Sequence, residues 1–154
     1  MDIQRRLDVL GLVLPAAPKP IASYTPYVRI GLQIYISGQL PIQNGSLIHK
    51  GRLGAEITIE QGKAAARCCA VNILSQMHAA CDGDLDRVER IIRLTGFVSC
   101  EAGFTDQPAV INGASDLFAD VFGEAGIHAR AAVGVSALPM GAPVEIDAIA
   151  HLRL

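Results

Sequence analysis

The chain has 154 residues, of which 51% are hydrophobic and 18% are charged, and its net charge is −2. A chain of this length can bury one hydrophobic core, which predicts a single domain over residues 1–154. A nucleic-acid-binding surface needs a basic stripe with interleaved aromatic side chains. The weakly acidic balance and the absence of tryptophan therefore argue against RNA or DNA as a partner. The low share of charged residues favours self-association, in which another copy covers part of the surface.

The four cysteines form no C-x-x-C pair, and no histidine lies at metal-ligand spacing from them. We therefore expect free thiols, mostly buried, in a reducing compartment. The N-terminus has no secretory signal pattern, and no stretch combines the length and apolar character of a membrane span. Together these features predict a cytoplasmic protein with no metal site and no membrane partner.

The first part of the chain predicts a short helix followed by a pair of strands. Apolar residues at helical spacing indicate the helix, and prolines between residues 15 and 20 force an extended segment after it. Alternation puts Leu32, Ile34 and Ile36 on one face of a strand, and Asn44-Gly45 is typical of a turn. The expected elements are a helix at 2–10, an extended lead-in that completes residues 1–19, two strands within 28–39 joined at Gly31, and an irregular segment at 46–57.

The second part predicts two longer helices and three strands. Thr58 and Gln61 have the spacing of a capping box, and Pro108 suits the first turn of a helix. The expected elements are helices from Thr58 to about Ala80 and at 106–122, and strands at 91–99, 133–138 and 144–152, the last two joined as a hairpin by residues 138–143. This order predicts an α+β fold, with two helices packed on one face of a mixed sheet.

Arg130 is the first candidate for binding chemistry. It precedes a run of small apolar residues, and burying an arginine alone is costly, so its side chain must either reach water or meet an anion. The forked guanidinium can hold a carboxylate through two parallel hydrogen bonds. A surface arginine and a carboxylate-binding arginine explain the residues equally well.

Glu145 lies in the last expected strand, where alternation places it on one face with Asp147 and His151. Such a glutamate is either a solvent-facing side chain or a carboxylate that moves a proton or orients a water. A regular hairpin would put Arg130 and Glu145 on opposite faces. One site could then hold both only through a bulge near Gly134, through the strand ends, or through a second chain.

Asn112 and Tyr27 are further candidates. A polar surface residue explains Asn112 better than a ligand contact does, and core or interface packing explains Tyr27 as well as closure over a ligand does. No nucleophile elbow, H-E-x-x-H motif or phosphate-binding loop occurs. The sequence therefore gives no indication of a metal or an organic cofactor.

Several segments together resemble the RidA/YjgF family of reactive-intermediate deaminases, also called endoribonuclease L-PSP proteins. The resemblance runs from about Pro20 to the C-terminus and includes an S-G-Q-x-P pattern at 37–41 and an R-x-x-V-x-V-x-x-L-P pattern at 130–139. Tyr27, Val28, Asn112 and the V-E-I-x-A pattern at 144–148 complete it. An extra N-terminal helix and the Gly-Arg-Leu-Gly-Ala segment at 51–55 are similar to a longer branch of that family.

The resemblance implies a bacillus-type chorismate-mutase-like fold and a homotrimer with clefts between subunits. By matching the family motifs, Arg130 would bind the carboxylate of an enamine or imine acid and Glu145 would orient a water. Tyr27, Asn112, Ala132 and the backbone at Gly38 would line the cleft. Position 132 departs from the pattern, because deaminases of the family usually carry cysteine there. A water mechanism does not need that thiol, so the departure affects substrate preference most.

The resulting hypothesis is hydrolysis of a small 2-imino acid, derived from an enamine such as 2-aminoacrylate, to a 2-keto acid and ammonia, without a cofactor. Arg130 would fix the carboxylate and so position the electrophilic carbon. Three alternatives stay open. The first is a non-catalytic binder or sensor of small carboxylates. The second is a ribonuclease, against which the charge balance argues. The third is a structural or chaperone-like trimer.

Overall fold

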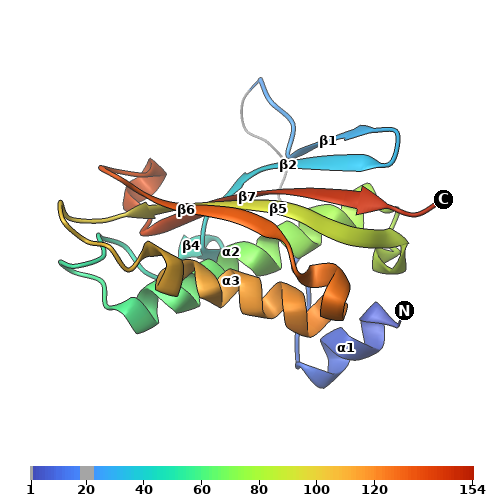
Figure 1. Cartoon of the computed structure of the whole chain (residues 1–154), viewed down its shortest axis with the longest axis horizontal. Coiled ribbons are helices and arrows are strands. Elements are labelled where there is room, and N and C mark those ends of the chain that lie inside the picture. The colour runs from blue at the N-terminus through green and yellow to red at the C-terminus, as the bar shows by residue number, and fades with distance from the viewer. Residues whose placement is uncertain (1, 18–22) are drawn as a thin grey trace.

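The structure is a computed structural model that describes residues 2–17 and 23–154. Within these ranges, five strands form a mixed sheet in the order β1-β2-β7-β5-β6, and two short strands form a separate ribbon (Figure 1). All pairs in the sheet are antiparallel except β5 with β6, which is parallel. The strands are β1 (Tyr27–Ile30), β2 (Gln33–Gln39), β3 (Ile42–Gln43), β4 (Ser46–Leu47), β5 (Val88–Ser99), β6 (Ala129–Val135) and β7 (Val144–Leu152).

The helices of the described ranges lie on one side of the sheet, as Figure 1 shows. Helices α2 and α3 run beneath the strands and pack on each other, and α1 packs against α3 and η1. This arrangement confirms the α+β class with two helices on one face of a mixed sheet, and it adds the short α1 beside them. The helices are α1 (Ile3–Val9), α2 (Ile59–Ala80) and α3 (Gln107–Phe122), with 3₁₀ turns η1 (Leu85–Arg87), η2 (Gly123–Gly126) and η3 (Pro139–Gly141).

Local sequence explains where the long helix begins and ends. The Thr58 hydroxyl accepts a hydrogen bond from the Gln61 amide at 3.2 Å, and the Gln61 side chain accepts one from the Thr58 amide at 2.9 Å, so the predicted capping box is present. After Cys81, Asp82 and Gly83 adopt positive φ and stop the helix. Burial alternates strictly along β7, so one face of this strand packs on the helices and the other does not.

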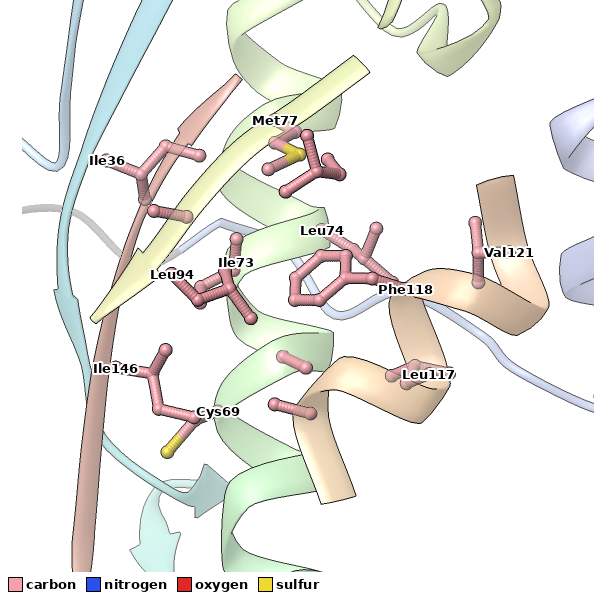
Figure 2. Packing of buried hydrophobic residues seen from close by; sticks show 14 of the residues in the cluster. Ile36, Cys69, Ile73, Leu74, Met77, Leu94, Leu117, Phe118, Val121 and Ile146 are labelled. Atoms are coloured by element: carbon pink, nitrogen blue, oxygen red, sulfur yellow. The ribbon is translucent and has the colours of Figure 1, made fainter. Parts of the chain in front are cut away.

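The hydrophobic core lies between the sheet and the two long helices. In Figure 2, Ile36, Leu94 and Ile146 of the sheet lie opposite side chains of α2 and α3. All of these side chains are almost completely buried. The helical side of this cluster consists of Cys69, Ile73, Leu74 and Met77 from α2 and Leu117, Phe118 and Val121 from α3.

The expected C-terminal hairpin is wrong. Strand β5 lies between β6 and β7 and pairs with both, so β6 and β7 are not neighbours. Strand β6 covers residues 129–135 instead of the expected 133–138, because the parallel partner β5 sets its length. The segment after β6 crosses the end of β5, where the Cys100 amide donates to Val135 and the Ser99 amide donates to Pro143.

The other elements lie close to the positions expected from the sequence. Helix α1, the strands joined at Gly31 and the turn at Asn44-Gly45 are confirmed, and a two-residue strand at 46–47 interrupts the segment expected to be irregular. The lead-in has no regular structure from residue 12 to 17, and its last residues, 18 and 19, lie outside the described residues. No helix in the described part of the chain has both the length and the apolar character to cross a membrane.

Candidate functional site

Arg130 lies on β6, the edge strand beside α3, with its side chain on the helix-covered side of the sheet. It pairs with Leu94, which is fully buried under the helices. The Nη1 atom of Arg130 donates to Asn112 Oδ1 at 2.8 Å and to Ser115 Oγ at 3.1 Å, and Nη2 donates to the carbonyl oxygen of Pro108 at 3.3 Å. Three acceptors from α3 therefore hold the guanidinium, and one of them is Asn112, which the sequence had offered only as a separate candidate.

A guanidinium has five N–H donors, and three of those in Arg130 are hydrogen-bonded to described residues. The two remaining donors are the number that a bidentate carboxylate contact requires. Ala132 follows on the same side of β6, where it pairs with Gly96 and is half-buried. This first group, Arg130 with Asn112, Ser115 and Ala132, is called the arginine half-site below.

Glu145 lies on β7 with its side chain on the opposite, uncovered side of the sheet. It pairs with Phe97, one of the half-buried residues on that side. Next to it, the register between β2 and β7 shifts between Ile36 and Gln39, which places Gly38 against the Glu145 side chain. A Cβ atom at Gly38 would overlap Glu145 Oε1 and lie 3.0 Å from its carboxyl carbon. A side chain at position 38 would therefore displace the Glu145 carboxylate from its present place, and Gly38 with Glu145 is called the glutamate half-site.

Partial burial raises the pKa of Glu145 above its ordinary value, and the nearby charge of Asp147 raises it further. Asp147 lies two residues along β7 and faces the same side. A carboxyl group with a raised pKa is a stronger base once it is ionised. This environment suits a group that accepts a proton from water.

The two half-sites lie on opposite faces of the sheet within one chain. Their partners on β5, Leu94 and Phe97, are an odd number of residues apart and so point to opposite sides. The sequence-based expectation of opposite faces therefore holds, although its reason was different. The register between β5 and β6 is continuous, so no bulge at Gly134 brings Arg130 and Glu145 together.

Tyr27 is separate from both half-sites. It pairs with the buried Ile36 and packs against the hydrophobic core on the helix-covered side of β1, with β2, β7 and β5 between it and β6. A pocket of about 500 Å³ lies close to β1 and β2 and includes Gly38 and Tyr24 in its lining. Within residues 2–17 and 23–154, no three His, Cys, Asp or Glu side chains are grouped so that they could hold a metal ion.

Sequence reasoning missed Ser115 as a partner of Arg130. The signal that could have indicated it is the helical spacing from Asn112, since residues three apart lie on one helix face. The structure also shows the Nε2 atom of His128 hydrogen-bonded to Ser115 Oγ at 3.0 Å.

Comparisons with known proteins agree with this fold. The model of the YjgF/chorismate mutase-like endoribonuclease family matches residues 4–152. Protein TCP17 of Trypanosoma cruzi is 50% identical over 98% of this chain and 94% of its own length. A 2-iminobutanoate/2-iminopropanoate deaminase of Capra hircus is 34% identical over 87% of this chain and 83% of its own. The chain therefore belongs to the YjgF/chorismate mutase-like family.

Solved structures resemble the chain to different degrees. A protein of unknown function from Agrobacterium tumefaciens is 47% identical and superimposes with a TM-score of 0.92, covering 98% of this chain and 92% of that one. RidA from an Antarctic Psychrobacter is 29% identical, with a TM-score of 0.60, covering 88% of this chain and 94% of that one. The match is thus closer to the former structure than to a protein named RidA.

Proposed function

We propose that this protein hydrolyses small 2-imino acids, formed from enamines such as 2-aminoacrylate, to 2-keto acids and ammonia. The observation that carries the proposal is the arginine half-site, in which Arg130 is fixed by three acceptors and keeps two N–H donors for a carboxylate. The names of relatives support it, because proteins 28% and 34% identical to this chain are called 2-iminobutanoate/2-iminopropanoate deaminases. The proposed compartment is the cytoplasm, which the free cysteines favour.

In the proposed reaction, Arg130 binds the substrate carboxylate and thereby fixes the neighbouring imine carbon. Glu145 accepts a proton from a water whose oxygen forms a bond to that carbon as the π bond of the imine breaks, and the imine nitrogen takes up a proton from solvent. In the resulting carbinolamine, Glu145 returns its proton to the amino group, the C–N bond breaks to release ammonia, and the hydroxyl proton leaves to solvent as the keto group forms. Such imines hydrolyse unaided in water, so only a modest acceleration is needed. Positioning of the substrate and one group that transfers a proton are enough to supply it.

The proposed site forms between subunits of a homotrimer, with the arginine half-site of one copy facing the glutamate half-site of another. Their location on opposite faces of one sheet supports this arrangement. The side of the sheet that carries Glu145 is not covered by any helix of residues 2–17 and 23–154, and its apolar residues are partly exposed, with Val28 at 46%, Tyr35 at 41% and Val133 at 43%. Covering such a face is a common reason for self-association.

We expect Arg130→Ala to reduce kcat/KM for imine hydrolysis by roughly 10- to 100-fold, because the substrate loses a charged hydrogen-bond partner. The measurement is 2-keto acid and ammonia release from 2-aminoacrylate that a dehydratase generates in the same cuvette. Acceleration by the wild type alone would support the proposal. Equal release with both proteins and without protein, for this and for larger imino acids, would reject it.

We expect a mixture of two impaired variants, Arg130→Ala and Glu145→Gln, to become more active than either variant alone after the subunits exchange. In a mixed trimer, a site that combines an intact arginine half-site with an intact glutamate half-site forms between two differently substituted chains. With equal amounts and random exchange, about a quarter of the sites would be intact. Each variant alone is the control, and a mixture as inactive as its components after full exchange would contradict a shared site.

A second candidate function is binding of small carboxylates without turnover. It is favoured by Ala132, which stands where deaminases of the family usually carry cysteine. It is also favoured by the TM-score of 0.92 to a structure of unknown function against 0.60 to a protein named RidA. Measurable binding of pyruvate to the wild type, weakened by Arg130→Ala, together with no acceleration of imine hydrolysis would select this function.

A further inference from the structure

Behind the arginine half-site, a chain of hydrogen bonds leads from Arg130 into the protein. Arg130 Nη1 lies 3.1 Å from Ser115 Oγ, and Ser115 Oγ lies 3.0 Å from His128 Nε2. His128 Nδ1 lies 2.6 Å from the carbonyl oxygen of Gly126. The imidazole ring is half-buried and contacts Phe118 edge-on, with a centroid distance of 6.0 Å and an interplanar angle of 82°. The packing of α3 and η2 therefore fixes the ring.

The donor in each of these bonds follows from the chemistry of the groups. A carbonyl oxygen only accepts, so His128 Nδ1 must carry the proton that is shared with Gly126. In a neutral imidazole, Nε2 then has a free lone pair, and it accepts a hydrogen bond from the Ser115 hydroxyl. The lone pairs of Ser115 Oγ are thereby left to accept from Arg130 Nη1. All three groups are satisfied in a single arrangement.

The charge state of the ring agrees with this arrangement. Burial lowers the pKa of His128 below its ordinary value, and the positive charge of Arg130 lowers it further, while the hydrogen bond to Gly126 acts in the opposite direction. The neutral form, which can accept from Ser115, is therefore the form present near pH 7.

The geometry points to Ser115 and His128 as positioning residues that orient the Arg130 guanidinium for its carboxylate ligand. The inference rests on the proposed function of Arg130. His128 holds the Ser115 hydroxyl proton away from the arginine, so that the serine oxygen always presents a lone pair to Nη1. Together with Asn112, this occupies both protons of Nη1 and fixes the guanidinium plane. A side chain already held in its binding orientation loses less conformational entropy when the ligand arrives.

The test is a kinetic and binding comparison of variants along this chain of bonds. We expect Ser115→Ala and His128→Phe each to raise KM for the imino acid about tenfold, while kcat stays within about twofold, because each removes ground-state and transition-state binding equally. Phenylalanine keeps a ring against Phe118, and Ser115→Thr retains the hydroxyl and should restore the wild-type KM. The dissociation constant of pyruvate, a carboxylate probe that needs no turnover, should rise in parallel.

Two further comparisons distinguish positioning from loss of structure. If the two residues act in series, the double variant Ser115→Ala/His128→Phe should have the KM of the single variants rather than their product. Ser75→Ala is the matched control, since the Ser75 hydroxyl donates to Val71 within α2 at 3.1 Å and its loss should leave KM unchanged. Multiplicative effects in the double variant, or KM and pyruvate affinity within twofold of wild type in both single variants, would overturn the inference.

The ring nitrogens of His128 give a readout that does not need activity. In ¹⁵N NMR spectra we expect the wild type to show the tautomer protonated at Nδ1, and we expect the Nε2 signal to shift in Ser115→Ala and in Arg130→Ala. If the wild type neither hydrolyses imines nor binds pyruvate, the proposed function fails, while these shifts would still support the hydrogen-bond chain. A tautomer protonated at Nε2, or a signal that none of the substitutions moves, would overturn the chain itself.

Discussion

We expect Glu145→Gln to lower kcat for imine hydrolysis by roughly 100- to 1,000-fold, because the amide cannot accept the proton of the attacking water. The same substitution should make the folded protein slightly more stable at pH 7. Burial and the charge of Asp147 raise the pKa of Glu145 in the folded state. Ionising this group therefore costs more in the folded protein than in the unfolded chain, and glutamine removes that cost.

The gain in stability should depend on pH in a defined direction. Above the raised pKa, Glu145 is ionised in both the folded and the unfolded state, and the glutamine variant then has its full advantage in free energy of unfolding. Below the ordinary value of 4.5 the group is protonated in both states, so the difference between glutamate and glutamine disappears. The gain at pH 7 is less than about 1 kcal/mol, since solvent screens a half-exposed group. Thermal unfolding of both proteins at pH 7 and near pH 4 measures it.

Asp147→Asn is the matched control for this prediction. Like Glu145→Gln it removes one negative charge, but the charge lies two residues along the strand. Its loss lowers the pKa of Glu145 and leaves the Glu145 carboxylate in place. We expect its kcat to stay within about threefold of wild type, because the proton acceptor is retained. An active Glu145→Gln variant, or a variant whose stability gain is larger near pH 4 than at pH 7, would contradict the role assigned to Glu145.

We expect Gly113→Ala to lower the free energy of unfolding by about 3 kcal/mol, a large effect for a single added methyl group. Gly113 lies on α3 where this helix meets α2. A Cβ atom there would overlap the carbonyl oxygen of Lys63 and lie 2.9 Å from its carbonyl carbon. Both clashing atoms belong to backbone, so no rotamer change can relieve the overlap and the two helices must move apart.

The measurement is the midpoint of thermal unfolding, which should fall by roughly 6–12 °C. Asp116→Ala is the control on the same helix, because Asp116 is exposed and its loss should change stability by less than about 0.5 kcal/mol. If Gly113→Ala were no less stable than this control, the close approach of α2 and α3 would be wrong. Because Asn112 precedes Gly113, separating the helices should also weaken the contact between Asn112 and Arg130.

Local signals in the sequence were sufficient for most of the elements. The capping box at Thr58 and Gln61 and the turn at Asn44-Gly45 depend on residues within one turn of the chain, and both are present in the structure. Alternation along residues 144–152 also separated the buried and uncovered faces of β7 correctly, so the side on which Glu145 lies was predictable. Arg130 and Asn112 were recognised as candidate site residues without structural information.

The order of the strands was not predictable from the same signals. Leu138-Pro139 and Gly141 are typical of a tight turn, so the segment after Arg130 was interpreted as half of a hairpin. The structure instead pairs β6 with β5 in parallel, a connection made by α3, and this pairing depends on how α3 packs against α2 and the sheet. The contacts of Ser115 with Arg130 and His128 follow from that packing, which explains why sequence reasoning did not find them.

The burial of the cysteines has a consequence for the chemical durability of the protein. Burial raises the pKa of Cys68 to about 11, raises that of Cys69 well above its ordinary value, and also raises that of Cys81. The thiolate is the form that attacks electrophiles and oxidants, and these three groups hold very little of it near neutral pH. Ala132 also leaves position 132, beside Arg130, without a thiol. For the proposed hydrolysis of imines and enamines, the consequence is that these three thiols and position 132 offer the substrates little thiolate to react with, which would protect the protein from inactivation at those positions.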